Sequence, residues 1–323
     1  MLPKFAYVRA ASKEQAIRHL ADRNASAFAG GTDLLGCLRE ETFPVDKVVS
    51  LGQIEEFKGV RATRDGGLRI GALTTITEVA EHPEISSRYP GLSQAAAAVA
   101  SPQLRNQGTL GGNLCQRPRC WYYRGQFHCL KKGGDECFAF AGENRYHAIF
   151  GGGPCYIVHP SDTAPALVAL EAQLTIAGPE GERRVPAGDF FVLPRERIDR
   201  EVILKADEIV TEVLLPRPAA NLRSSYRKVR ERLAWDFALT SVALALEFDG
   251  SSISKARVVL GGVAPIPWRA EAAEQVLKGK TITRDTARQA SLAAAQGADP
   301  LEQNAYKVEL VKGVVEESLL ALA

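Results

Sequence analysis

The pattern of apolar and polar positions predicts three successive architectures along the chain. Up to about residue 56, short apolar strands alternate with short helices, and the second strand ends at a pair of glycines. From about residue 58 the apolar residues fall in short runs separated by turn residues such as Asp65-Gly66, which is typical of β-hairpins. Beyond about residue 219, alternating runs predict antiparallel strands, and three helical runs follow. We therefore expect an α+β protein.

The same pattern gives residue ranges for the elements and domains. Strands are expected at 5–8, 25–29, 45–51, 156–158, 202–215, 225–229, 238–248 and 256–260, with hairpins turning at 65–66 and 178–181. Helices are expected at 12–21, opened by a capping box of Ser12 and Gln15, and at 32–39, 76–81, 91–100, 161–171, 269–277, 284–295 and 304–322. Residues 1–56 and 57–218 would form a two-part domain, a small α/β subdomain plus a larger β-rich subdomain. After a linker at 217–220, residues 219–323 would form a C-terminal antiparallel sheet with helices.

Composition narrows the class of protein. Among the 323 residues, 46% are hydrophobic and 24% charged, which is typical of a globular chain. Lys and Arg number 40 against 38 Asp and Glu, so a net charge of +2 gives no reason to expect nucleic acid or an anionic membrane as a partner. Apolar runs such as 239–246 are far shorter than the roughly 20 residues of a membrane span, and the N-terminus lacks the apolar region of a secretory signal. We expect no span and no export signal of its own.

Two glycine-containing turns are candidates for binding an anion. The first turn is Ala29-Gly30-Gly31-Thr32-Asp33, between a strand and a helix, and the second is Thr109-Leu110-Gly111-Gly112-Asn113. Small residues let backbone N–H groups approach a phosphate, and a helix N-terminus adds its dipole. Either turn could instead be a tight turn that needs positive φ, but two together favour a diphosphate ligand. Neither matches G-x-G-x-x-G or the P-loop, so the sequence argues against a Rossmann domain and a P-loop NTPase.

Five of the six cysteines lie between residues 115 and 155, spaced Cys115-x4-Cys120-x8-Cys129-x7-Cys137-x17-Cys155. No C-x-x-C pair occurs, so zinc ribbons and thioredoxin-like sites lose their usual signature. Four thiolates from a long loop can hold a [4Fe–4S] cluster, but the spacing leaves iron–sulfur, zinc and reduced, idle thiols open. Basic residues among the cysteines could offset a negative cluster or be a solvated face: Arg117, Arg119, Arg124, Lys131 and Lys132.

Several single polar residues are further candidates for binding a ligand or a metal. Asp162 could accept hydrogen bonds from a ribose-type hydroxyl or cap the helix that it begins. Lys228 lies on an expected strand, whose exposed face it could simply occupy. His128, His147 and His159 could be ligands or hydrogen-bonded structural residues. No Ser–His–Asp order, H-E-x-x-H motif or catalytic carboxylate pair is present, so the sequence contains no recognisable catalytic centre of its own.

These motifs together resemble the FAD-binding medium subunit of the xanthine dehydrogenase (molybdenum hydroxylase) family. The resemblance covers nearly the whole chain. It is carried by AGGTDLL at 29–35, QLRNQGTLGGNL at 103–114, HPSDTAPAL at 159–167, YRKVRER at 226–232 and VVLGGVAPIPWRA at 258–270. The cysteine-rich insert at about 115–158 resembles the branch that binds a [4Fe–4S] cluster, which includes bacterial aldehyde oxidoreductases and 4-hydroxybenzoyl-CoA reductase. LRNQ, CWYY and GGVAPIPWR look closer to the aldehyde oxidoreductases.

The resemblance implies cofactors and the residues that bind them. The FAD contacts would be Ala29, Gly30, Gly31, Thr32, Asp33, Leu34, Thr109, Gly111, Gly112, Asn113, Asp162 and Lys228. The ligands of a [4Fe–4S] cluster would be Cys120, Cys129, Cys137 and Cys155, whereas Cys115 matches a position that is not a ligand.

The function that the resemblance implies is electron transfer. A large molybdopterin subunit would oxidise an aldehyde, a small subunit with two [2Fe–2S] clusters would relay electrons, and this chain would pass them through FAD to an external acceptor. A 4-hydroxybenzoyl-CoA reductase, with electrons flowing the other way, is one alternative, and a zinc-organised scaffold without redox function is another. The aldehyde, the acceptor and the compartment stay open, since a cytoplasmic location and export to the periplasm with a partner's twin-arginine signal both fit.

Overall fold

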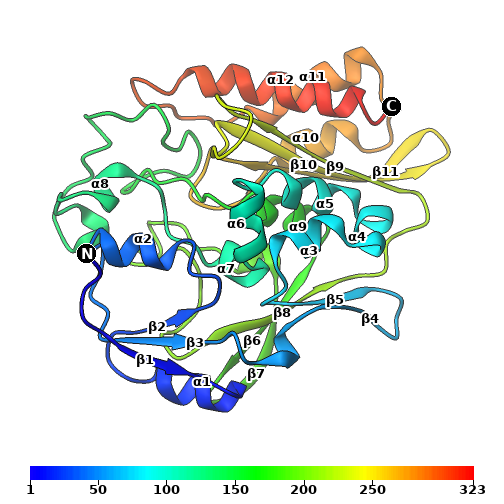
Figure 1. Cartoon of the computed structure of the whole chain (residues 1–323). Coiled ribbons are helices and arrows are strands. Elements are labelled where there is room, and N and C mark those ends of the chain that lie inside the picture. The colour runs from blue at the N-terminus through cyan, green and yellow to red at the C-terminus, as the bar shows by residue number, and fades with distance from the viewer.

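The computed structural model describes all residues from Met1 to Ala323 and contains three sheets. Figure 1 shows the two N-terminal sheets at the bottom, a layer of helices above them, then the third sheet, and a last layer of helices at the top. The expectation of an α+β protein, with a two-part first domain and a C-terminal antiparallel sheet covered by helices, is confirmed. No helix combines the length and apolar character that crossing a membrane requires.

The first sheet is parallel and small, in the order β1-β3-β2. Its elements are β1 (Ala6–Arg9), α1 (Lys13–Leu20), β2 (Ala25–Phe28), α2 (Leu34–Arg39), β3 (Lys47–Ser50) and the 3-10 turn η1 (Glu55–Phe57). Ser12 begins α1 as predicted, because its side chain accepts the backbone N–H of Gln15 at 3.3 Å. The parallel order places the end of β2, and the glycines after it, at one edge of this sheet.

The second sheet is antiparallel, in the order β4-β5-β8-β6-β7. Its strands are β4 (Val60–Ala62), β5 (Leu68–Gly71), β6 (Gln173–Gly178), β7 (Gly181–Pro186) and β8 (Ile209–Leu215). The helices between β5 and β6 are α3 (Ile76–Glu81), α4 (Pro83–Arg88), α5 (Pro90–Ala97), α6 (Pro102–Gln107), α7 (Leu110–Leu114), α8 (Trp121–Arg124) and α9 (Thr163–Ala169), with the 3-10 turn η2 (Leu130–Lys132) before α9. A further 3-10 turn, η3 (Ala187–Asp189), follows β7.

The third sheet is antiparallel, in the order β12-β11-β10-β9. Its elements are β9 (Leu222–Val229), β10 (Thr240–Asp249), β11 (Ser252–Gly261), β12 (Trp268–Arg269), α10 (Glu271–Leu277), α11 (Arg284–Ala294) and α12 (Tyr306–Leu320). The run in β10 is almost continuously apolar because the strand is covered on both faces. Ala243 and Ala245 face the middle helices, whereas Val242, Leu244 and Leu246 face α10 to α12.

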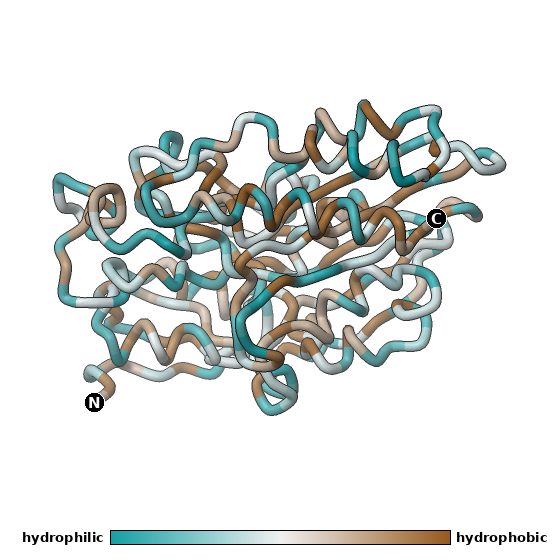
Figure 2. The backbone as a smooth tube through the Cα atoms, turned by 90° about the horizontal axis from the view of Figure 1, so that it is seen from above, coloured by the Kyte–Doolittle hydropathy of each residue, from teal (hydrophilic) through white to brown (hydrophobic).

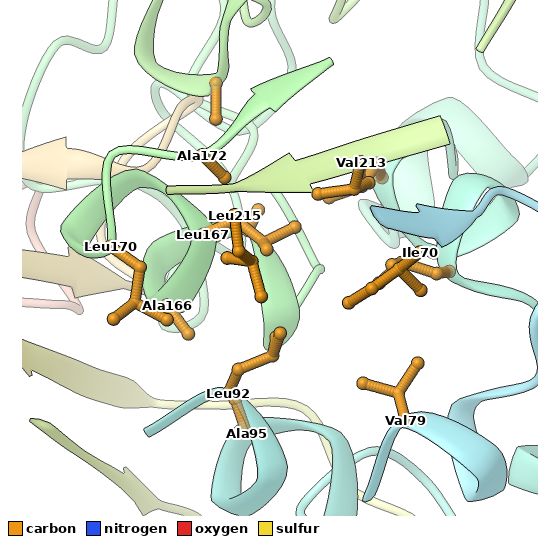
Figure 3. Packing of buried hydrophobic residues seen from close by; sticks show 14 of the residues in the cluster. Ile70, Val79, Leu92, Ala95, Ala166, Leu167, Leu170, Ala172, Val213 and Leu215 are labelled. Carbon is orange, nitrogen blue, oxygen red and sulfur yellow. The ribbon is translucent and has the colours of Figure 1, made fainter. Parts of the chain in front are cut away.

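Two large apolar cores join these layers, and two smaller clusters pack around the first sheet. The larger lies between the second sheet and the middle helices, and Figure 3 shows Ile70, Val213 and Leu215 of the sheet opposite Val79 and Leu92 of the helices. The other core lies between the third sheet and its helices. In Figure 2, apolar and polar stretches alternate along the helices, as expected for elements with one buried face.

The structure corrects two predicted strands. Residues 156–158 belong to no sheet, because their backbone makes only scattered bonds, such as that from the Ala148 N–H to the Tyr156 carbonyl at 2.9 Å. The strand expected at 202–215 begins only at Ile209. Lys205 and Glu208 form a turn before it, in which the Lys205 N–H donates to the Glu208 carboxylate at 2.9 Å.

Candidate functional site

A cleft of ≈ 690 Å³ lies where the first two sheets meet the cysteine-rich insert, residues 115–158. Eleven of the twelve residues predicted to contact FAD line it: Ala29, Gly30, Gly31, Thr32, Asp33, Leu34, Thr109, Gly111, Gly112, Asn113 and Asp162. The twelfth, Lys228, lies behind Asp162 rather than on the wall of the cleft. The fold thus brings together residues from three distant segments.

The first glycine turn is built to expose its backbone. Gly31 has a φ of +71°, which favours glycine, and a Cβ on Gly30 would collide with the carbonyl oxygen of Gln107 at the end of α6. None of the backbone N–H groups from Gly30 to Leu34 donates a hydrogen bond within the chain. Five consecutive free donors where a strand meets a helix can bind an anionic group such as a diphosphate.

Asp33 in this turn is held by the insert. Its carboxylate accepts hydrogen bonds from the Arg117 N–H at 2.7 Å and from Arg124 Nη2 at 2.6 Å, and it also pairs with Arg119. Burial raises the pKa of Asp33, but the charges of Arg119 and Arg124 outweigh burial and hold that pKa below its usual value. Asp33 therefore orients the turn through contacts within the chain.

The second glycine turn works differently from the first. Four of its five N–H groups are paired within the chain: Leu110 donates to Thr74, Gly111 to Ala72, Asn113 to Thr109, and Gly112 to the Thr109 hydroxyl at 3.3 Å. The Thr109 N–H alone donates to no acceptor in the chain, so this turn offers an open glycine surface rather than a row of free donors. A Cβ on Gly111 would press on Ala72 at 2.8 Å, whereas one on Gly112 would meet only the Thr109 hydroxyl at 3.0 Å and would otherwise face open space.

Asn113 connects the second turn to α9. Its Oδ1 accepts the hydroxyls of Ser161 at 2.6 Å and Thr163 at 2.7 Å. Both acceptor bonds go to the chain, and the amide nitrogen of Asn113 has no acceptor there, so a ligand carbonyl or phosphate oxygen in the cleft could take its N–H groups.

Asp162 is the buried centre of a charged group. Its Oδ2 accepts Lys228 Nζ at 2.7 Å, and its Oδ1 accepts the Tyr226 hydroxyl at 2.6 Å. Burial raises the pKa of Asp162, opposed by the charge of Lys228. The side chain makes no capping bond to α9, so the helix-cap alternative is wrong. Tyr226 had no predicted role, although its spacing of two from Lys228 on a strand places both on one face and could have indicated it.

Four of the five cysteines of the insert lie around one hollow. Cys120, Cys129, Cys137 and Cys155 line one small, mainly apolar hollow together with Tyr122, Tyr123, Phe138 and Ile157. A hydrogen bond from Cys155 lowers the pKa of the Cys137 thiol to about 6. No three His, Cys, Asp or Glu side chains are arranged to hold a single metal ion, and all six cysteines are free of disulfides.

The other two cysteines lie elsewhere. Cys115 lines the cleft and packs on the larger core, and burial raises the pKa of its thiol to about 12. Cys37 is buried in α2, and burial raises its pKa to about 11.

Four of the five Lys and Arg residues between Cys115 and Cys137 pair with carboxylates from outside the insert, and the fifth, Lys132, donates to the Gly125 carbonyl at 2.7 Å. Arg119 and Arg124 pair with Asp33 as described. Lys131 is buried and pairs with Glu201 at 2.5 Å, and Arg117 Nε lies 3.1 Å from the same carboxylate. The expectation of a solvated face is therefore wrong for these four bases, because carboxylates distant in the sequence pair with them and so fasten the insert to the rest of the chain. Lys131 also lines the hollow that holds the four thiols, so the expectation that a base offsets a negative cluster stays a prediction.

Comparison with known proteins gives the family of the chain. Residues 3–218 match the FAD binding domain in molybdopterin dehydrogenase, and residues 224–322 match the CO dehydrogenase flavoprotein C-terminal domain. The chain belongs to the FAD-binding subunits of the molybdenum hydroxylase family. The resemblance predicted from the sequence motifs is confirmed, and the chain is a subunit of an oxidoreductase of this family.

Relatives and solved structures agree with this family. The chain is 39% identical over 293 residues to the aldehyde oxidoreductase FAD-binding subunit PaoB of Escherichia coli, covering 89% of this chain and 88% of that one. It is 26% identical to the carbon monoxide dehydrogenase medium chain of Hydrogenophaga pseudoflava, covering 99% and 97%. A structure of that organism's carbon monoxide dehydrogenase superposes with a TM-score of 0.79 at 27% identity, covering 99% of this chain and 98% of that one. Quinoline 2-oxidoreductase from Pseudomonas putida 86 gives a TM-score of 0.77 at 26% identity, covering 99% and 97%.

Proposed function

We propose that this chain is the FAD-carrying electron-transfer subunit of a molybdenum-dependent aldehyde oxidoreductase. The observation that carries the proposal is the 39% identity, over most of both chains, to a protein named as the FAD-binding subunit of an aldehyde oxidoreductase. The cleft adds physical support, because free N–H donors at one turn and an open, Cβ-free surface at Gly112 suit a ligand with a diphosphate and a bulky ring system.

In this proposal, different residues of the cleft bind different parts of FAD. The N–H groups from Gly30 to Leu34 bind the diphosphate of FAD, and Asn113 donates to a polar edge of the cofactor. Asp162, held by Lys228 and Tyr226, presents a fixed negative group beside the cofactor. When bound, FAD supplies the ability to accept electrons singly and to release them singly or in pairs.

We further propose that Cys120, Cys129, Cys137 and Cys155 hold one [4Fe–4S] cluster. Support comes from the shared hollow that these four thiols line while Cys115 and Cys37 lie outside it. Thiols that surround a hollow, without converging on one point, suit a cluster better than a single zinc ion. When bound, the cluster supplies a site for one electron at a time.

The partners in this proposal are a large molybdopterin subunit, where the aldehyde is oxidised, a small subunit with two [2Fe–2S] clusters, and an external electron acceptor. Support comes from relatives named as a medium chain or a medium subunit, names that imply larger and smaller chains beside them.

The test compares the purified complex with the isolated chain. We expect the complex to oxidise aldehydes with a dye acceptor, and the isolated chain to contain FAD but to give no aldehyde turnover. Aldehyde turnover by the isolated chain, or a complex that reduces an aromatic acyl-CoA and oxidises no aldehyde, would contradict the proposal. Iron, acid-labile sulfide and zinc analysis of the same sample tests the cluster.

A further inference from the structure

One side chain outside the four thiols forms a hydrogen bond to them. Nε2 of His147 lies 3.2 Å from Sγ of Cys120. His147 is buried, with only 4% of its surface exposed, and its ring lies beside Trp121 and Tyr122 at centroid distances of 6.0 and 6.3 Å. Lys131 also lines the hollow, but its ammonium pairs with Glu201, and Arg119 and Arg124 pair with Asp33. His147 is thus the side chain that donates or accepts a hydrogen bond at a cysteine sulfur from outside the four thiols.

The position of this ring is fixed from the C-terminal domain. The carbonyl of His147 accepts hydrogen bonds from Asn304 Nδ2 and from Lys307 Nζ, both at 3.1 Å. Lys307 is wholly buried, and its ammonium also donates to the carbonyls of Tyr146 at 2.9 Å and Gly262 at 2.8 Å. These contacts hold the backbone of His147 without help from any cysteine, so the ring is pre-organised toward Cys120.

The state of the cysteine decides whether the nitrogen of His147 or the sulfur of Cys120 carries the proton of this hydrogen bond. A cysteine sulfur that ligates iron is a thiolate and can only accept, so Nε2 must be the donor. Nδ1 of the same ring is buried and has no partner. In a neutral imidazole with its proton on Nε2, Nδ1 carries only a lone pair, which is the arrangement that leaves no buried N–H without an acceptor.

We propose that His147 is a positioning residue for the [4Fe–4S] cluster, donating an Nε2–H hydrogen bond to the Cys120 thiolate. The inference rests on the cluster proposed above. A donor on a ligand sulfur stabilises the more negative, reduced cluster, and so it raises the reduction potential and holds the ligand in place. His147 would thereby set how readily this centre exchanges electrons.

The test uses the holoenzyme complex with three variants of this chain. His147→Ala removes the donor, His147→Gln keeps an N–H donor on a side chain of similar reach, and His128→Ala is the matched control, because His128 is an exposed histidine of the same insert. Iron and acid-labile sulfide are measured per chain, and the midpoint potential of the cluster is measured by a redox titration followed by electron paramagnetic resonance. We expect a lower potential in His147→Ala, recovery toward the wild-type value in His147→Gln, and no change in His128→Ala.

Loss of iron in His147→Ala with retention in His147→Gln would also support the proposal, since the donor then holds the ligand. An unchanged potential in a fully loaded His147→Ala would overturn it, as would loss of iron in both His147 variants. Cys120→Ser with a full cluster would overturn it too, by showing that Cys120 is not a ligand. Wild-type protein without iron and sulfide would contradict the cluster itself, which is a separate result.

Discussion

Asp33 in the first glycine turn accepts a hydrogen bond at 2.6 Å from Nη2 of Arg124, a residue of the cysteine-rich insert. The two residues lie 91 positions apart in the sequence. Because Asp33 also accepts from Arg117 and pairs with Arg119, the turn proposed to bind the diphosphate and the segment proposed to bind the cluster form one connected structure. A substitution that disrupts the turn should therefore also destabilise the insert, and the reverse should hold.

The first prediction tests this connection. Asp33→Asn should lower the affinity for FAD and loosen the insert, because Arg119 and Arg124 lose a buried anionic partner at a cost of about 2 kcal/mol. FAD titration and limited proteolysis within residues 115–158 measure the two effects. Glu40→Gln is the control, since Glu40 also contacts Arg124, at 3.2 Å, but is exposed. Wild-type flavin affinity and protease resistance in Asp33→Asn would show that the turn and the insert are independent.

The second prediction concerns the open surface at Gly112 in the second glycine turn. Gly112→Leu should abolish FAD binding while the protein stays folded, because a side chain there points into open space within the cleft. Gly313→Leu is the matched control on α12, where a Cβ meets nothing. Flavin content from the absorption spectrum and the melting temperature separate binding from stability. Full flavin occupancy in Gly112→Leu would show that the second glycine turn does not contact FAD.

The third prediction separates ligand cysteines from the others. Cys129→Ser should lose most of the iron and become more sensitive to protease within the insert, because metal-binding energy is also folding energy there. Cys115→Ser should keep about four irons per chain, since Cys115 packs against the larger core instead. Cys37→Ser, in α2, is the control. The iron content of each variant is measured. Loss of iron in Cys115→Ser with retention in Cys120→Ser would show that Cys115, and not Cys120, is the fourth ligand.

The fourth prediction concerns pH. Burial lowers the pKa of His159 to about 3 from an ordinary 6.5, so between these values the unfolded chain binds a proton that the folded chain does not. This residue should therefore cost the protein stability as the pH falls through that window, by up to about 1.4 kcal/mol per pH unit. Urea unfolding of wild type and His159→Gln from pH 7 to pH 4 measures it. The free energy of unfolding of His159→Gln, relative to that of the wild type, should increase as the pH falls. A relative free energy that stays constant over this pH range would contradict the prediction.

Local features of the sequence could be predicted well. Gly30 and Gly31 were predicted to form a turn between a strand and a helix because their neighbours show the period of each element. The continuous apolar run of β10 likewise indicated a strand. The sequence of residues 156–158 predicted a strand wrongly, because its apolar run pairs with no neighbouring strand and only Ile157 of the three is buried.

Long-range pairings could not be predicted from the sequence. Nothing near Arg119 or Arg124 indicates that their partner is Asp33, because local patterns carry no information on which distant charge the fold brings near. In the same way, cysteine spacing could not distinguish Cys115 from Cys120, whereas the fold turns one toward the core and the other toward the shared hollow. The contact of His147 with Cys120 depends on Lys307 and Asn304, far along the chain.

The contact of α12 with the insert also means that the two do not fold as separate modules. Lys307 of α12 donates to the carbonyls of Tyr146 and His147, which lie up to 161 residues earlier in the chain, and to that of Gly262. Removing its side chain takes a buried donor away from all three carbonyls, and a buried carbonyl without a donor costs stability. The penalty would therefore appear partly in the insert, although the altered residue belongs to the C-terminal helix.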